Sequence, residues 1–532
     1  MNTAPRTIDR PWWHGSTGYE VYLRSFADGS GDGVGDLSGL LGRLDYLAWL
    51  GIDLVWVTPF YPSPMHDHGY DVSDYCDVDP SFGDLGTFDA VVTRAHELGM
   101  RLVIDLIPNH TSIDHPWFRA SRSSREDAYR DYYIWRDPAP DGGPPNNWLA
   151  TFGGRAWSFD PVTEQYYCHL HLSDQPDLNW ANPAVREAFE GILRFWLDRG
   201  VDGFRIDVAH GLVKDSQFRD NPPSLPEERM SGAGRAASSQ LLRRVHDVNQ
   251  PGVLDIYRRW RAIAEEYDAL LLGEVFLRDP RDLARYVQDD DGLHLAFWFE
   301  PLQIEWESAT IRKVLTAATE AMADRVGWIQ GTHDRTRSPT RFGGGEAGRH
   351  RSLALATLFA GLPGIPFIYQ GEELGMEDVE VPNELMQDPI AIRQGEYASS
   401  RDGCRTPIPW EPGPGLGFTG DATPWLPFGD HAGQTVAEQR STPHSLLRRY
   451  RELIALRRDR LAEGAFAWLV DDGPVVAYRR RDLVVAANCG HEAADASWLR
   501  TGTVLFDTGG ESGDPAASVG PLLPDHARIL EL

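Results

Sequence analysis

The chain has 532 residues, of which 42% are hydrophobic and 24% are charged, a profile typical of a globular protein. It is too long for one ordinary domain and suits two or three, or one large barrel with additions. A formal net charge of -28 at pH 7 repels phosphate backbones and argues against nucleic acid as a partner. The same charge suits a neutral substrate, although solubility alone explains it equally well.

Membrane and export signals are not found in the sequence. The sequence contains no run of 18 or more apolar residues, the length that is needed to span a membrane. The start, 1–13, lacks the charged and apolar segments of a secretion signal. The four cysteines, Cys76, Cys168, Cys404 and Cys489, are scattered without the spacing of a metal site or a disulfide framework. We therefore expect a cytoplasmic protein with reduced thiols.

Short apolar runs, each followed by a helix-like stretch, set the expected fold. The runs occupy 54–59, 101–106, 203–207, 270–275 and 365–370, and amphipathic segments such as 88–98 and 185–197 lie between them. Continuous apolar strands that alternate with helices indicate a parallel sheet covered on both faces. Over this length a closed (β/α)8 barrel, the TIM barrel, is favoured, and an open doubly wound sheet is the alternative.

Two insertions and a tail depart from this alternation. Residues 109–181 are rich in Trp, Tyr, Pro and Gly and predict an inserted domain after the third strand, and 372–440 form a Pro/Gly-rich excursion after the last strand. The barrel is thus assigned to 1–108 and 182–461. From 462 to 532, short runs at 466–470, 475–478 and 483–487 predict a C-terminal antiparallel β-domain.

Polar side chains gather where the predicted strands end, which is where barrel enzymes place their reactive groups. The groups are Asp105 with Asn109 and His110, Arg205 with Asp207, Glu274, and His333 with Asp334. One such carboxylate would more often cap a helix or lie in a solvated loop. Four in series, at successive strand ends, indicate a catalytic site.

Paired carboxyls at strand ends fit the cleavage of glycosides, which needs one ionised and one protonated carboxyl group. Arg205 lies two residues before Asp207 on a strand and points to the same face. We expect this cation to keep Asp207 ionised as a nucleophile. Glu274 follows the apolar run 270–273, and burial near other carboxylates would keep it protonated as a general acid.

Five segments resemble the signatures of a known family. Residues 105–110 (DLIPNH), 203–207 (GFRID), 273–275 (GEV) and 333–334 (HD) resemble the four signature regions of the α-amylase family of glycoside hydrolases. Residues 175–179 (QPDLN) resemble a further signature, that of its oligo-1,6-glucosidase and α-glucosidase branch. The resemblance covers nearly the whole chain. It implies that Asp207 is the nucleophile, Glu274 the acid/base and Asp334 the transition-state stabiliser.

The resemblance also implies a pocket for a terminal glucose. Asp67 and Tyr70 look like the branch's sugar-clamping Asp and stacking Tyr, although a turn-forming role is the alternative. Arg401 resembles the Arg that pairs with that Asp, and Phe152 resembles an aromatic residue that lines the pocket. The signature residues His110, Arg205 and His333 join the substrate-binding set. Two positions depart from the family pattern: His171, where relatives often carry Phe, and Thr332, where many carry Asn.

The function implied is an exo-acting retaining α-glucosidase that acts on short glucose-containing oligosaccharides through a covalent β-glucosyl-Asp intermediate. A transglucosidase or sugar isomerase of the same family is the alternative, and the long segment 211–257 would hold the acceptor. A catalytically inactive relative is the third reading, and the intact triad opposes it. Val208 resembles a linkage-selecting position at which Val accompanies α-1,6 activity, so we expect isomaltose to be accepted.

A possible metal loop lies at 28–36, where oxygen-bearing residues alternate with glycines. Asp28, Ser30, Asp32, Asp36 and the carbonyl of Val34 would suit a structural Ca²⁺ or Mg²⁺. Gly39 stands where an EF-hand loop carries its bidentate Glu, so a plain Asp/Gly turn is the alternative. The branch has a similar metal loop. We expect no organic cofactor, and a small sugar is the expected partner; the sequence leaves the oligomeric state open.

Overall fold

The structure is a computed structural model. It describes residues 11–225, 236–395, 397–431, 433–469, 473–494, 502–509 and 520–532. Val470, the end of one predicted strand, lies outside the described residues. No helix in the described part of the chain is long and apolar enough to cross a membrane.

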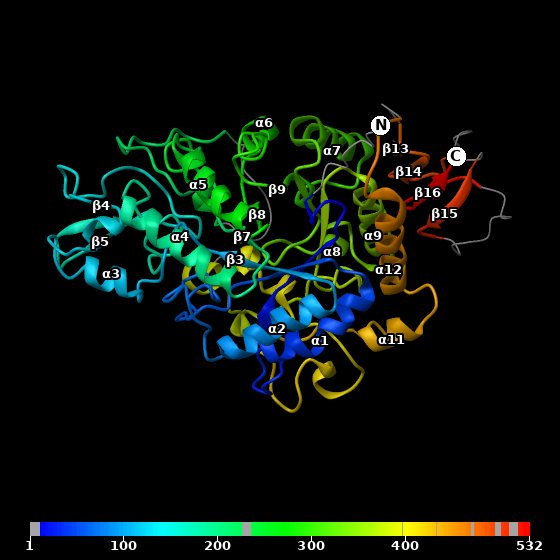
Figure 1. The fold of residues 1–532 in the computed structure, drawn as a ribbon, viewed down its shortest axis with the longest axis horizontal. Helices are drawn as coiled ribbons and strands as arrows, with labels where there is room; N and C mark the ends of the chain where they lie inside the picture. Colours follow the sequence, from blue (N-terminus) through cyan, green and yellow to red (C-terminus); the bar gives the residue numbers. More distant parts are fainter. Residues whose placement is uncertain are drawn as a thin grey trace, which may run out of the picture.

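Eight parallel strands close into a barrel in the order β1-β11-β10-β9-β8-β7-β3-β2 (Figure 1). The strands are β1 (Gly18–Val21), β2 (Leu54–Val57), β3 (Arg101–Leu106), β7 (Gly203–Ile206), β8 (Leu270–Gly273), β9 (Leu295–Trp298), β10 (Val326–Ile329) and β11 (Ile365–Tyr369). Every strand residue except Arg101 is buried, as parallel strands covered by helices require. The predicted TIM barrel is confirmed, and the open-sheet alternative is wrong.

Three barrel strands were missed by the sequence reading: β1, β9 and β10. Strand β1 begins with a glycine and β10 has one at its second position, whereas β9 contains none. The barrel needs these glycines, because a Cβ at Gly18 would lie 2.3 Å from the Phe367 ring and one at Gly327 would lie 2.7 Å from the Phe297 ring. Close packing inside the barrel therefore weakens the strand signal of β1 and β10, while nothing in the structure explains why β9 was missed.

Helices cover the outside of the barrel. They are α1 (Leu37–Leu50), α2 (Leu85–Glu97), α4 (Pro183–Asp198), α5 (Val253–Glu266), α6 (Pro280–Ala284), α7 (Ser308–Met322), α8 (Ser338–Arg341), α9 (Gly345–Gly361) and α12 (Leu446–Leu456). The start of α4 shows why the sequence folds this way: the Asn182 side chain accepts the Ala184 N–H, and Pro183 occupies the first turn. Val185, Phe189 and Trp196 then turn one face of α4 to the core.

The segment between β3 and α4 contains α3 (Pro116–Ser121) and a small sheet, ordered β4 (Trp135–Arg136), β6 (Gln165–Cys168), β5 (Trp157–Asp160), which projects at the left of Figure 1. The excursion after β11 holds α10 (Pro389–Gln394) and α11 (Val436–Ser441). It returns beneath the barrel in Figure 1.

The tail folds into a five-stranded sheet, as predicted. Its antiparallel order is β12 (Phe466–Trp468), β13 (Val475–Arg480), β14 (Leu483–Asn488), β16 (Ala527–Glu531) and β15 (Thr503–Asp507). Helix α9 contacts β14 and β16, which explains why α9 is buried on most of its surface. The division of the chain at 108, 181 and 461 stays a prediction.

Candidate active site

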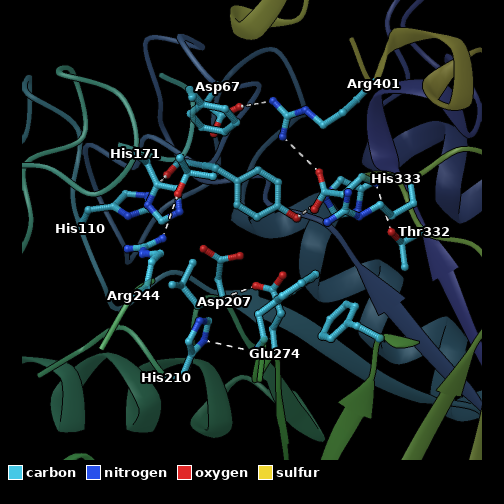
Figure 2. A pocket seen from close by; sticks show the side chains of 18 residues that line it. Asp67, His110, His171, Asp207, His210, Arg244, Glu274, Thr332, His333 and Arg401 are labelled. Carbon is cyan, nitrogen blue, oxygen red and sulfur yellow. Dashed lines mark hydrogen bonds and ion pairs between the residues drawn. The ribbon is translucent and has the colours of Figure 1, made fainter. Parts of the chain in front are cut away.

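A cavity of about 90 Å³ lies among the loops that follow the barrel strands (Figure 2). The structure brings these sequence-predicted residues into its wall: Asp67, Tyr70, His110, Phe152, His171, Asp207, Val208, Glu274, His333, Asp334 and Arg401. Figure 2 shows Asp207 and Glu274 on one side, with Asp67 and Arg401 on the other. The wall also contains residues to which the sequence reading gave no role: Thr151, His210, Arg244, Phe276, Phe299, Thr332 and Arg335.

Arg205 lies beneath the cavity and joins three carboxyl groups. The parallel register places Arg205 on β7 beside Asp105 on β3. Its Nη1 donates to Asp105 Oδ1 at 2.7 Å and to Asp207 Oδ1 at 2.9 Å, and its Nη2 lies 3.2 Å from Glu274 Oε2. Because the guanidinium is only 2% exposed, these ion pairs are largely shielded from water.

Arg205 contacts both catalytic candidates, Asp207 and Glu274. Burial and the Glu274 carboxylate raise the pKa of Asp207 well above its ordinary value, and the attraction of Arg205 does not offset them. Arg205 acts to lower the pKa of Asp207, and the same guanidinium also pairs with Glu274.

Asp334 is held as an anion by two arginines. Its Oδ1 accepts from Arg401 Nη1 at 3.1 Å and from Arg405 Nη2 at 2.8 Å, and Oδ2 lies 3.4 Å from His333 Nε2. Burial acts to raise the pKa of Asp334, but His333, Arg401 and Arg405 outweigh it and hold that pKa well below the usual value. A negative charge is therefore fixed at this wall of the cavity.

Arg401 also closes one end of the cavity. Its Nη2 donates to Asp67 Oδ1 at 3.0 Å, the pairing that the family resemblance implied. Gln175 donates to the other oxygen, Oδ2, of Asp67 at 3.1 Å. Asp388, at the start of α10, accepts from the Arg401 backbone N–H, Nε and Nη2 at 2.6, 2.9 and 3.1 Å. The sequence reading missed Asp388, because nothing in a Pro/Gly-rich excursion marks an acidic residue as a partner of a distant Arg.

Tyr70 and His333 form the floor of the cavity between its Asp207–Glu274 side and its Asp67–Arg401 side. The Tyr70 hydroxyl donates to Asp105 Oδ2 at 2.9 Å and lies 3.0 Å from His333 Nε2, and the two rings stack at 5.5 Å. His333 Nδ1 hydrogen-bonds Glu20 on β1. Burial lowers the pKa of His333 well below its usual value. One face of the Tyr70 ring is thus occupied by His333.

Two histidines line the opposite wall. His110 Nε2 bonds the Tyr70 carbonyl at 3.1 Å, and burial lowers the pKa of His110 to about 4. His171, the departure from the family pattern, lies with its ring 4.9 Å from His110 and 5.9 Å from Phe152. His171 therefore does belong to the pocket wall.

The signature at 175–179 also contributes a buried ion pair and hydrogen bonds. Its Asp177 pairs with Lys214 Nζ at 2.8 Å and accepts from Asn109 Nδ2 at 3.2 Å. Lys214 in turn donates to Asn109 Oδ1 at 2.7 Å. This buried triad joins the signature 105–110 to the loop after the predicted nucleophile, and no spacing in the sequence revealed it.

Val208 has an unusual backbone. Its φ of 45° lies in the left-handed region, which is strained for a β-branched residue. The conformation turns the Val208 N–H toward Glu274 Oε2, to which it donates at 2.9 Å. Gly211 makes room for it, since a Cβ there would lie 2.7 Å from Val208 Cγ1.

In the predicted metal loop, the carboxylates of Asp28 and Asp36 accept hydrogen bonds from backbone N–H groups. Asp28 accepts from the N–H groups of Gly31 at 2.6 Å and Gly33 at 2.8 Å, and Asp36 accepts from those of Ser30 at 2.8 Å and Gly39 at 2.7 Å. Among the described residues, no group of three or more His, Cys, Asp or Glu side chains is arranged to hold a metal ion.

Comparison with known proteins identifies the family. Residues 20–464 match the family model described as alpha amylase, catalytic domain. The chain belongs to the α-amylase family. It is 43% identical over 486 residues, covering 89% of this chain and 87% of the relative, to a probable alpha-glucosidase of Rhizobium meliloti (strain 1021). It is 35% identical over 516 residues to an oligo-1,6-glucosidase of Parageobacillus thermoglucosidasius, covering 90% and 89% of the two chains.

Solved structures of the family include transfer enzymes. The α-glucosyl transfer enzyme XgtA is similar with a TM-score of 0.90 and 39% identity, covering 98% of this chain and 99% of that one. The trehalulose synthase MutB, in a variant crystallised with sucrose, is similar with a TM-score of 0.87 and 31% identity, covering 98% and 99%. The relatives of this protein in the α-amylase family therefore include both hydrolases and glucosyl-transfer enzymes.

Proposed function

We propose that this protein is an exo-acting retaining α-glucosidase that removes terminal glucose units from short α-linked oligosaccharides or α-glucosides. The observation that carries the proposal is the Asp207–Glu274 pair, bridged by Arg205, in a cavity closed at one end by Arg401 and Asp67. The similarity to α-glucosidases and oligo-1,6-glucosidases supports the same activity.

The proposed reaction starts with a proton on Glu274 and with Asp207 ionised. Glu274 gives that proton to the glycosidic oxygen while the Asp207 carboxylate attacks the anomeric carbon, which forms a β-glucosyl ester and releases the leaving group. Glu274, now ionised, takes a proton from water as that water attacks the ester. The product is α-glucose, and both carboxyl groups return to their starting state.

Charge at the other walls favours the transition state. The ionised Asp334 faces a sugar ring that becomes positively charged as the bond breaks, and a buried carboxylate stabilises that charge more in the transition state than in the ground state. Asp67 accepts hydrogen bonds from hydroxyls of the same glucose, and Arg401 holds Asp67 in place. Because this ion pair closes the cavity behind one glucose, the enzyme acts at chain ends.

A single substitution tests the proposal. We expect Asp207→Asn to reduce kcat on 4-nitrophenyl α-glucoside by about 10⁴-fold or more, because an amide cannot form the ester intermediate. Circular dichroism should show an unchanged fold. In the parent protein, NMR should detect newly released glucose first as the α-anomer. More than a few per cent residual activity, or immediate release of the β-anomer, contradicts the mechanism.

A glucosyl-transfer activity is the second candidate, favoured by the similarity to XgtA and MutB. Here a sugar hydroxyl replaces water in the second step, and the 211–257 segment supplies Arg244 to the cavity wall. Product analysis at high sugar concentration separates the two. Transfer products or isomerised disaccharides in excess over free glucose would favour this second candidate.

Three narrower assignments belong to the same proposal. A structural Ca²⁺ or Mg²⁺ at Asp28, Ser30, Asp32, Asp36 and the Val34 carbonyl rests on the alternating oxygens of the loop. The partner is a small sugar, and the net charge of -28 argues against nucleic acid. A cytoplasmic location is supported by the four free cysteines, three of them buried, and cell fractionation would test it.

A further inference from the structure

The carboxyl group of Glu20 is buried in the barrel and has no part in the proposed reaction. Glu20 is on β1, where the parallel register places it beside Trp56 on β2 and Tyr369 on β11. It is 1% exposed and is not among the residues that line the cavity. A carboxyl group in such a place costs free energy unless its partners compensate it, so the partners indicate what it does.

Glu20 bonds both the side chain and the backbone of His333, the residue before Asp334. Its Oε1 hydrogen-bonds His333 Nδ1 and accepts from the His333 backbone N–H at 3.3 Å. The His333 ring lies between the Tyr22 ring at 5.4 Å and the Tyr70 ring at 5.5 Å, each inclined to it by 15°. The imidazole is therefore held on both faces and at its Nδ1 edge.

The other ring nitrogen of His333, Nε2, faces two oxygens that accept hydrogen bonds. The Tyr70 hydroxyl, 3.0 Å away, gives its single proton to Asp105 Oδ2 at 2.9 Å, so its oxygen offers only lone pairs to Nε2. Asp334 Oδ2, 3.4 Å away, belongs to an ionised carboxylate and cannot donate. Two acceptors at one nitrogen require a proton on that nitrogen.

Glutamate is suited to keeping the Nε2 proton in place. A neutral histidine with its proton on Nε2 has an acceptor at Nδ1, and a charged histidine has a donor there. Glu20 suits both forms, because its protonated carboxyl donates to Nδ1 and its carboxylate accepts from Nδ1. An amide does not: its oxygen would need the proton on Nδ1, and its NH2 group would face the His333 backbone N–H.

The charges around Glu20 act on the same proton. Burial raises the pKa of Glu20 well above its usual value, and Asp334 and Asp105 act in the same direction. Arg205 and the hydrogen bond from the His333 backbone act in the opposite direction and do not offset burial. The form of Glu20 that carries a proton is therefore favoured, and that form donates to Nδ1.

We propose that Glu20 is a positioning residue that keeps a proton on His333 Nε2 and so fixes the contacts of His333 with Asp334 and Tyr70. The inference rests on the proposed function, in which Asp334 stabilises the positive charge on the sugar ring. Without the Nε2 proton, a lone pair would face Asp334 Oδ2, and repulsion would move that carboxylate. Because Asp334 acts mainly in the transition state, loss of Glu20 should lower kcat rather than raise KM.

Glu20→Gln tests the proposal with almost no change of shape. With 4-nitrophenyl α-glucoside we expect kcat and kcat/KM to fall together by about 100-fold, as when one preorganised contact to a transition-state charge is removed. Glu373→Gln is the matched control, because Glu373 is also fully buried and bonds the Tyr19 and Tyr46 hydroxyls, at 2.8 and 2.7 Å, away from the cavity. The control should lower the melting temperature and leave both kinetic constants within about twofold of the parent.

A double-mutant cycle shows whether Glu20 acts through His333. His333→Ala removes both ring nitrogens, so no proton remains for Glu20 to place. In that background, Glu20→Gln should change kcat by less than about twofold. The same loss of about 100-fold in both backgrounds would mean that Glu20 acts independently of His333, which overturns the proposal.

NMR separates this inference from the proposed function. Proton–nitrogen spectra of protein with isotope-labelled histidine report which ring nitrogen carries a proton, and the His333→Ala spectrum identifies the His333 signals. We expect a protonated Nε2 in the parent and an unprotonated Nε2 in Glu20→Gln. If the parent cleaves no α-glucoside, the proposed function fails, and these spectra still decide the role of Glu20.

Three results would overturn the inference. They are an unprotonated Nε2 in the parent, identical His333 signals in the parent and Glu20→Gln, and a Glu20→Gln variant that loses less than about threefold in kcat while its melting temperature falls. Should Glu20→Gln fail to fold, the parent spectrum decides alone: a protonated Nε2 supports the assignment, and an unprotonated one refutes it.

Discussion

Asp388 shows how a residue that touches no substrate can shape the cavity. It accepts three hydrogen bonds from Arg401, whose remaining donors reach Asp67 and Asp334. Burial acts to raise the pKa of Asp388, but Arg401 lowers it to about 2, so the ion pair persists across the working pH range. Asp388 is therefore a positioning residue for both ends of the glucose pocket.

We expect Asp388→Asn to raise KM for 4-nitrophenyl α-glucoside about tenfold and to lower kcat less than threefold. The reason is that a neutral amide holds Arg401 more weakly, at a cost of about 1–3 kcal/mol. Asp279→Asn, which alters the equivalent exposed cap of α6, is the control. A change confined to the melting temperature, with both kinetic constants intact, would show that Asp388 has only a structural role.

Val208 offers a test of linkage preference. Thr and Val are both β-branched, so Val208→Thr keeps the strain of the φ of 45° and changes only a methyl to a hydroxyl. We expect the parent to accept isomaltose and the variant to shift the isomaltose-to-maltose ratio of kcat/KM toward maltose by up to about tenfold, since one such contact is worth about 1–3 kcal/mol. If the parent already prefers maltose tenfold, Val208 does not control linkage.

The residues that were predictable are those that follow strands. Asp207, Glu274 and Asp334 come at the ends of barrel strands, where the fold makes position in the sequence a guide to position in space. Asp388 and Arg335 were not found, because their roles depend on how irregular segments return to the site. The sequence also does not show that Arg205 is shared between Asp207 and Glu274.

At the scale of elements, β3 was predicted from its apolar run, whereas β10 was missed. Strand β3 carries five consecutive buried residues, and its extent, 101–106, is confirmed to the residue. Strand β10 is equally buried, but Gly327 weakens its β propensity while relieving contact with Phe297. Its identity depends on its neighbours in the barrel rather than on its own sequence.

The loop before α1 is the element on which a metal would act. Asp36 caps α1 through the Gly39 N–H, so an ion bound at this loop would stabilise the start of that helix and the first barrel loop. No catalytic candidate lies in the loop. We therefore expect chelation to lower the melting temperature by several degrees and to leave activity at mild temperature nearly unchanged. Metal analysis of the purified protein that finds no divalent ion would refute the assignment.

At the scale of the whole molecule, one buried carboxyl group links the barrel to its outer helices. Glu372 follows β11 and is fully buried; its Oε1 accepts from Gln330 Nε2 at 2.7 Å, beyond β10, and from the Tyr450 hydroxyl at 3.1 Å, on α12. Burial raises the pKa of Glu372 to about 7. Ionisation in this place would put a charge in the core, so the neutral form belongs to the folded protein.

The stability of the protein should consequently depend on pH near neutrality. The folded pKa of about 7 is above the ordinary value of 4.5, so the contribution of Glu372 is fully present below about pH 4.5 and is lost as pH rises through 7. A shift of this size corresponds to about 3 kcal/mol at most. Glu372→Gln keeps the acceptor oxygen for Gln330 and Tyr450 but cannot ionise, so the variant should lose less free energy of unfolding between pH 5 and pH 9 than the parent loses.

Urea unfolding at pH 5, 7 and 9 measures that difference directly. Glu346→Gln, at an exposed position in the first turn of α9, is the matched control and should follow the parent at every pH. Parallel curves for parent and Glu372→Gln would mean that Glu372 is already ionised at pH 5 or stays neutral at pH 9. A variant that gains stability relative to the parent between about pH 4.5 and pH 7, and runs parallel to the parent above that range, would establish that ionisation of this carboxyl group weakens the barrel.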